Sequence, residues 1–226
     1  MSVTKREVLK SNIVLVGIAL LNSEAEIDAF RNAVDAEVTV ELPGLPGLSL
    51  SSPLQEVPRL IKINRDRIVL NISPERSVIE RQYPSADDLS RLADIASLAI
   101  THTVSGSASA PSAFGFNVEM LYESDTTPRA SRYIADRLFD PELSVNDGWA
   151  LHGGSAKLSF ASGESLWNVA IEPRFQDGET PKVYFSLNLH RGEARLPSTT
   201  DIVTSLQETW TNAEAFVAKF DKVSWQ

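Results

Sequence analysis

Strands follow one another along much of this chain, and this order restricts the fold more than any single motif does. Short runs rich in Ile, Val and Leu between turn residues predict about eight to ten strands, and helical periods predict about four helices. Parallel α/β folds need a helix between successive strands, and simple alternation is missing here. The sequence therefore predicts an α+β fold, with about four helices packed on a mostly antiparallel sheet. The expected strands are residues 11–21, 37–41, 60–64, 67–72, 78–79, 113–123, 149–160, 166–175 and 182–190.

Local signals place the helices. Ser23 and Glu26 have the spacing of a capping box, in which each side chain satisfies a free backbone donor of the other residue. Ser85 can cap a second helix, and Pro128 favours the first turn of a third. Thr199 or Thr200 can begin the last helix, which has the clearest apolar stripe: Ile202, Leu206, Trp210, Ala213, Val217 and Phe220.

Aromatic residues are divided unevenly by a soft Ser-rich stretch, residues 105–112. Phe30 and Tyr83 alone precede it, whereas all four Trp, three Tyr and eight Phe follow it. The first half must therefore fill its core with aliphatic side chains and the second with aromatic ones. Both halves share a loose order of strands closed by a helix, but no internal repeat indicates a duplication. We expect residues 1–226 to form a single domain, the alternative being two subdomains, 1–104 and 113–226.

The composition limits compartment and partners. The chain has 226 residues and no cysteine, which excludes a disulfide scaffold, a thiol nucleophile and Cys-ligated zinc. The apolar run after Ser11 is too short to span a membrane, so we expect a cytoplasmic protein without membrane contact. A net charge of −9 disfavours nucleic acid. Residues 59–81 are locally basic, and we favour a solvated hairpin face there over an anion-binding patch.

Signatures of catalysis are missing from the sequence. The three histidines, His102, His152 and His190, lack metal-ligand spacing, and neither a nucleophile elbow nor a phosphate-binding glycine loop is present. We therefore predict no metal, no cofactor and no catalytic residue. The alternative is an enzyme, such as a hydrolase, that binds a small ligand in a carboxylate and histidine pocket between the two halves. Glu119 or Glu172 would supply its carboxylate.

A contact surface is the function that the sequence favours. Aromatic residues are concentrated in the second half, and aromatic and arginine side chains are enriched where proteins meet. We therefore expect a binding or assembly protein that acts through protein–protein contacts, with a protein partner or a second copy of itself, as a homo-oligomer. The candidate surface residues are Phe114, Phe116, Trp149, Trp167, Arg174, His190 and Trp225.

Several fragments within residues 59–220 resemble a sporadically distributed family of uncharacterised bacterial proteins. The shared fragments are Arg65-Asp-Arg67 leading to Asn71, Tyr83-Pro84 before a helix, Phe114-Gly-Phe-Asn117, and Ser186-Leu-Asn-Leu-His190 before a long helix with Trp210 and Phe216. The resemblance implies an α+β fold. It supplies no catalytic residue, because that family has no established activity to carry over.

Overall fold

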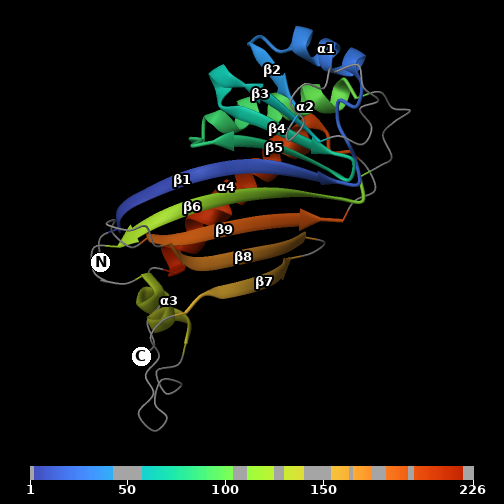
Figure 1. The fold of residues 1–226 in the computed structure, drawn as a ribbon. Coiled ribbons are helices and arrows are strands. Elements are labelled where there is room, and N and C mark those ends of the chain that lie inside the picture. Colours follow the sequence, from blue (N-terminus) through green and yellow to red (C-terminus); the bar gives the residue numbers. More distant parts are fainter. Residues whose placement is uncertain are drawn as a thin grey trace.

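The computed structural model describes residues 3–42, 58–103, 111–124, 130–139, 154–162, 165–174, 182–192 and 196–220. Its strands form one nine-stranded sheet in the order β2-β3-β4-β5-β1-β6-β9-β8-β7, and every neighbouring pair is antiparallel (Figure 1). Four α-helices pack on this sheet within the described residues. The predicted α+β fold with a mostly antiparallel sheet and about four helices is confirmed.

The first half of the chain builds one side of the sheet. Its elements are β1 (Val3–Val16), α1 (Glu24–Ala33), β2 (Val38–Glu41), β3 (Arg59–Ile63), β4 (Ile68–Ser73), β5 (Arg76–Gln82) and α2 (Asp88–Thr101). The second half builds the other side. Its elements are β6 (Ala113–Ser124), α3 (Ala130–Leu138), β7 (Ala156–Ser162), β8 (Ser165–Arg174), β9 (Lys182–Arg191) and α4 (Thr199–Phe220).

Both halves have the same topology. Read from the outside of the sheet towards its middle, β3-β4-β5-β1 in the first half correspond to β7-β8-β9-β6 in the second. The order along the chain also matches when β2 is set aside. In each half a strand and a helix come first, and three paired strands, β3 to β5 or β7 to β9, and a closing helix follow. The halves meet where β1 pairs with β6 in the middle of the sheet. β2, which pairs with the outer edge of β3, is the one described strand without a counterpart.

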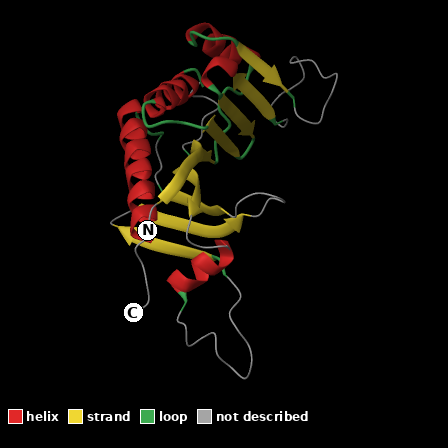
Figure 2. Ribbon diagram, turned by 90° about the vertical axis from the view of Figure 1, so that its left-hand side faces the viewer, coloured by secondary structure: helices red, strands yellow, loops and turns green. Residues whose placement is uncertain are grey.

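One face of the sheet carries the helices α2 and α4, which lie against each other (Figure 2). The strand residues that point towards them alternate with residues on the uncovered face, as pleating requires. In the first half this layer is aliphatic, with Ile61, Leu70 and Ile79 buried. In the second half it is aromatic, with Phe116 and Phe185 buried, so the uneven aromatic content reflects two ways of filling one core.

The ends of several elements differ from the sequence prediction. The first strand begins at Val3, because the polar residues before Ser11 pair with the far end of β6. It ends at Val16 and the chain turns at Gly17, whose φ of 79° is accessible to glycine. The capping box of Ser23 and Glu26 is confirmed. Ser198, one residue earlier than expected, caps α4 by exchanging hydrogen bonds with Asp201.

None of the helices in the described ranges is long and apolar enough to cross a membrane.

Candidate functional site

A solvent-open groove of ≈ 450 Å³ lies on the helix-bearing face, between α4 and the outer strands β7 and β8. Its floor comes from the strands and its wall from one side of α4. The floor is apolar, and polar side chains stand at the helix rim. The lining residues are Phe160, Trp167, Val169, Leu187, Glu208, Asn212, Ala215, Phe216 and Lys219.

Phe160 is the unusual member of this groove. It lies in β7 opposite Trp167 and leaves 46% of its surface exposed, although its ring packs edge-on against Phe216 at 6.2 Å. From Phe216 the ring contacts continue inward to Phe185 and Phe220, at 6.3 and 6.4 Å between centroids. The groove is therefore the solvent-exposed end of the aromatic core. Covering its apolar surface with a partner would be favourable, because it would remove that surface from water.

β7 is also the outermost strand of the sheet that the described residues form. It pairs with β8 on one side only, and no other described strand lies along its outer side. An edge strand presents unpaired N–H and C=O groups, so it can accept another strand. The groove and this edge adjoin because Phe160 belongs to both. Together they offer apolar contact area and backbone hydrogen bonds, the two components that a bound peptide strand uses.

The uncovered face of the sheet carries a row of polar side chains in register across five strands. Asn12, Asn117, Asn188, Asn168 and Ser159 lie opposite one another in β1, β6, β9, β8 and β7. Asn188 Nδ2 donates to Asn117 Oδ1, and Asn117 Nδ2 donates to Asn12 Oδ1 at 2.5 Å. Ser159 Oγ lies 2.7 Å from Asn168 Oδ1. The bond between Asn117 and Asn12 crosses the junction of the two halves, and the others join strands of the second half.

Charged side chains lie beside this row at the same junction. Lys10 Nζ is 3.3 Å from Glu80 of β5 and 3.1 Å from Glu119 of β6. Burial opposes the charge of Lys10, but its hydrogen bonds with the two carboxylates and their attraction outweigh that cost and raise its pKa. Burial, and then a hydrogen bond to Glu119, raise the pKa of the Tyr184 phenol. Arg174 stacks over the Tyr184 ring at 4.3 Å. These groups neutralise one another, which suits a structural network.

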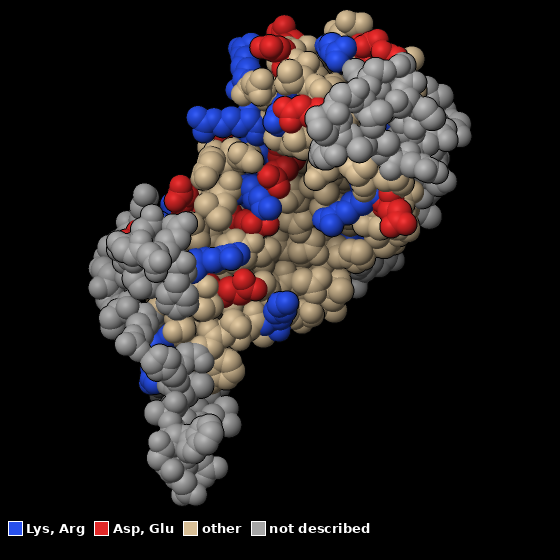
Figure 3. All heavy atoms as spheres, viewed as in Figure 1, with Lys and Arg blue, Asp and Glu red and all other residues tan. Residues whose placement is uncertain are grey.

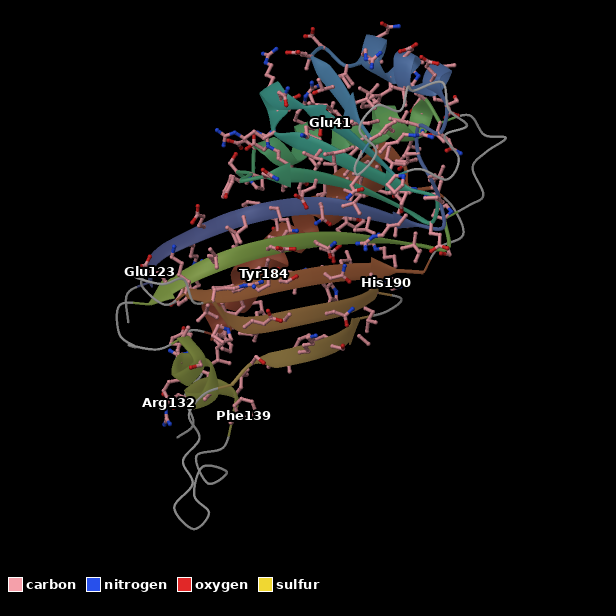
Figure 4. The ribbon with its side chains drawn as sticks, in the orientation of Figure 1. Glu41, Glu123, Arg132, Phe139, Tyr184 and His190 are labelled. Atoms are coloured by element: carbon pink, nitrogen blue, oxygen red, sulfur yellow. The ribbon has the colours of Figure 1, made fainter. Side chains whose placement is uncertain are left out.

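His190 and Glu172 do not lie together in a pocket. His190 lies opposite Gly115 and Leu166, whereas Glu172 lies opposite Tyr184, six positions along β9. That spacing is roughly 20 Å at the rise of a strand. Figure 4 shows Tyr184 and His190 near opposite ends of β9. Among the described residues, no three His, Asp or Glu side chains come close enough to hold a metal ion.

The seven predicted surface residues fall into four groups. Phe114 and Phe116 are 1% and 0% exposed and pack edge-on in the core, so neither contributes to an accessible surface. Trp167 lines the groove and is 9% exposed. Arg174 and His190 are exposed, but they lie on the opposite, uncovered face of the sheet. Trp149 and Trp225 lie outside the described residues. Phe160 and Phe216, which the sequence analysis did not select, are the aromatic residues that meet at the groove.

The basic segment 59–81 supplies several structural contacts. Arg59 is buried and donates to the backbone oxygens of Leu21 and Asn22, at 2.5 and 3.0 Å. Lys62 pairs with Glu41 at 2.7 Å. Arg81 pairs with Asp88 at 2.7 Å, and this contact ties β5 to the start of α2. Figure 3 shows acidic and basic side chains interspersed over the uncovered face, and no strongly basic patch dominates it.

Comparison with known proteins adds no family. No family model and no curated protein matches the chain. The resemblance to the bacterial family described above therefore stays a prediction. A solved structure of the S. pombe Pct1 RNA triphosphatase in complex with the Spt5 CTD aligns with 99% of this chain and 88% of its own chain at 7% identity. Its TM-score is 0.16, and a likeness this weak carries no argument about fold or function.

Proposed function

We propose that this protein is a binding or assembly protein that acts through protein–protein contacts, and that the groove between α4 and β7 is its contact surface. The observation that carries the proposal is Phe160, an aromatic side chain that is 46% exposed in an apolar groove, beside a strand edge along which no other described strand lies. Exposed apolar surface next to free backbone donors and acceptors is costly to maintain unless a partner covers it.

The distribution of polar groups also supports a contact surface over a catalytic one. Asn212, Glu208 and Lys219 stand at the groove's rim, whereas its floor is apolar. Interfaces commonly combine an apolar centre that carries most of the binding energy with a polar rim. The titratable groups that are paired across the junction of the halves lie on the uncovered face, away from the groove.

Photo-crosslinking in the native host tests this proposal. A benzophenone amino acid at Ala215, an exposed groove position on α4, should form a covalent adduct with a protein. The same label at Gln207, which is exposed on α4 but does not line the groove, is the matched control and should form far less. Equal labelling at the two positions, or no adduct from Ala215, would refute a contact surface at the groove.

A further inference from the structure

We propose that the partner strand at β7 is β7 of a second copy of this chain, paired antiparallel about Ser159 so that two sheets continue into one. This inference rests on the contact surface proposed above and names its occupant. The outer edge of β7, the repeated topology of the two halves and the sequence of the strand itself each support it.

The other end of the sheet shows how this topology accommodates an additional strand. β3 corresponds to β7, and its outer edge is covered by β2, which runs antiparallel with Val38 opposite Ile63 and Glu41 opposite Leu60. Alongside β7 the described part of the chain provides no such strand. Among the described residues, the position beside β7 that corresponds to β2 therefore holds no strand, and a strand of a second copy would fit it.

The two outer strands are protected very differently. β2 has four residues, and its Glu41 forms an ion pair with Lys62 of β3 at 2.7 Å. Short length and charge both discourage pairing with another chain. β7 has seven residues, contains no proline and carries one charged side chain, Lys157. Its Leu158 and Phe160 project onto the helix-bearing side with Val169 and Trp167 opposite them. Apart from Lys157, β7 lacks the features that keep an edge strand from pairing.

The sequence of β7 complements itself. Antiparallel pairing centred on Ser159, the middle of the strand, places Leu158 of each copy opposite Phe160 of the other. Aliphatic–aromatic cross-strand pairs stabilise sheets. The same register sets Lys157 opposite Ala161, so the two lysines do not face each other. All seven residues pair in this register, whereas a shift in either direction leaves residues of each strand unpaired.

The groove fits the same arrangement. The two-fold axis of this arrangement passes between the two Ser159 residues, perpendicular to the sheet, so both α4 helices lie on the same side of the joined sheets. Leu158 and Phe160 of the second copy then lie next to the exposed Phe160 ring of the first. The rim offers one acid and one base, Glu208 and Lys219. A second copy therefore meets no excess of one charge. An interface that uses the same patch twice closes as a dimer.

Single cysteines test this register, because the chain has none of its own. Ser159→Cys should cross-link to a dimer with a short bis-maleimide, whereas Glu75→Cys, in the exposed β4–β5 turn, should stay monomeric. Lys157→Cys should cross-link poorly with itself and efficiently when mixed with Ala161→Cys. Efficient cross-linking of Glu75→Cys, or none with Ser159→Cys, would overturn the proposal.

Light scattering supplies the second test. The protein should have twice the mass of one chain at tens of micromolar. Phe160→Glu should shift it to a monomer, since two carboxylates would then sit in the joined apolar layer. Leu166→Glu is the matched control, because Leu166 is similarly exposed, at 40%, but lies on the other face of the sheet, and it should leave the dimer intact.

The outcomes separate this inference from the function on which it rests. A monomer at every concentration, together with a photo-adduct at Ala215 to a different protein, overturns the second copy and leaves the contact surface standing. A dimer that survives Phe160→Glu and does not cross-link through Ser159→Cys has its interface elsewhere, which also overturns the inference. An adduct of twice the chain's mass, with the expected cysteine pattern, supports both proposals.

Discussion

Replacing Asn117 by alanine tests whether the polar row holds the two halves together. Asn117 lies in β6 between its neighbours in β1 and β9, where it donates to Asn12 Oδ1 at 2.5 Å and accepts from Asn188 Nδ2. Asn117→Ala removes both hydrogen bonds at once, and no other side chain occupies that position in the row.

The size of the effect follows from the burial of this row. A hydrogen bond contributes about 1 kcal/mol net, so two lost bonds cost about 2 kcal/mol. Asn12 is only 5% exposed, and its unpaired oxygen adds roughly 1–2 kcal/mol because water reaches it poorly. We therefore expect Asn117→Ala to lower the free energy of unfolding by about 3–4 kcal/mol.

Urea unfolding at neutral pH measures this loss. Asn71→Ala is the matched control, since Asn71 lies on the same face in β4 but is exposed. It should change stability by less than about 0.5 kcal/mol. The double replacement with Asn12→Ala should show coupling of about 1 kcal/mol, because the two residues share one bond. If Asn117→Ala and Asn71→Ala differ by less than the error of the fits, the row does not stabilise the junction.

Three further predictions concern buried and titrating groups. Arg59→Met should destabilise the protein by about 3 kcal/mol in the same urea assay, because two charge-assisted bonds from a buried arginine, to the backbone oxygens of Leu21 and Asn22, are lost; a change below about 1 kcal/mol would contradict this. Burial raises the pKa of Tyr184, so above pH 10 the unfolded chain loses this proton before the folded protein does. The free energy of unfolding therefore falls by about 1.4 kcal/mol per pH unit above pH 10. Tyr184→Phe should reduce this dependence on pH, as measured by urea unfolding at several alkaline pH values. A backbone hydrogen bond from Ser85 lowers the pKa of Asp88, so its contribution is present above the pKa of a free aspartate and is lost as pH falls through the folded value. Asp88→Asn should therefore lose less stability between neutral and acidic pH than the parent, and an unchanged acid midpoint would count against this contact.

Local patterns predicted local structure well. The Ser23 and Glu26 spacing identified the start of α1, because a capping box needs only residues three apart. The turn at residues 64–66 identified the β3–β4 hairpin, and the period of α4 identified its buried stripe. In each case the pattern involves residues that are close to one another in the sequence.

The candidate surface required information that no local pattern contains. Alternation in β6 predicted that Phe114 and Phe116 share a face, but a core face and a contact face have the same period. Phe160 becomes distinctive only because β7 is the outermost strand, which depends on the order of the whole sheet. The row of asparagines likewise exists only through register, since Asn12 and Asn117 are 105 residues apart.

The position of β1 in the sheet has a consequence for how the chain is made. β1 is synthesised before both of its neighbours in the sheet, and one of them, β6, follows it about a hundred residues later. The first half can pair β1 with β5 while the opposite edge of β1, with its run of apolar and amide side chains, stays open. Pairings between distant segments form slowly, and an unpaired strand is a template for the wrong neighbour. Until β6 arrives, the middle strand of the finished sheet is an edge strand, so a nascent chain paused between the halves is the species most prone to aggregate.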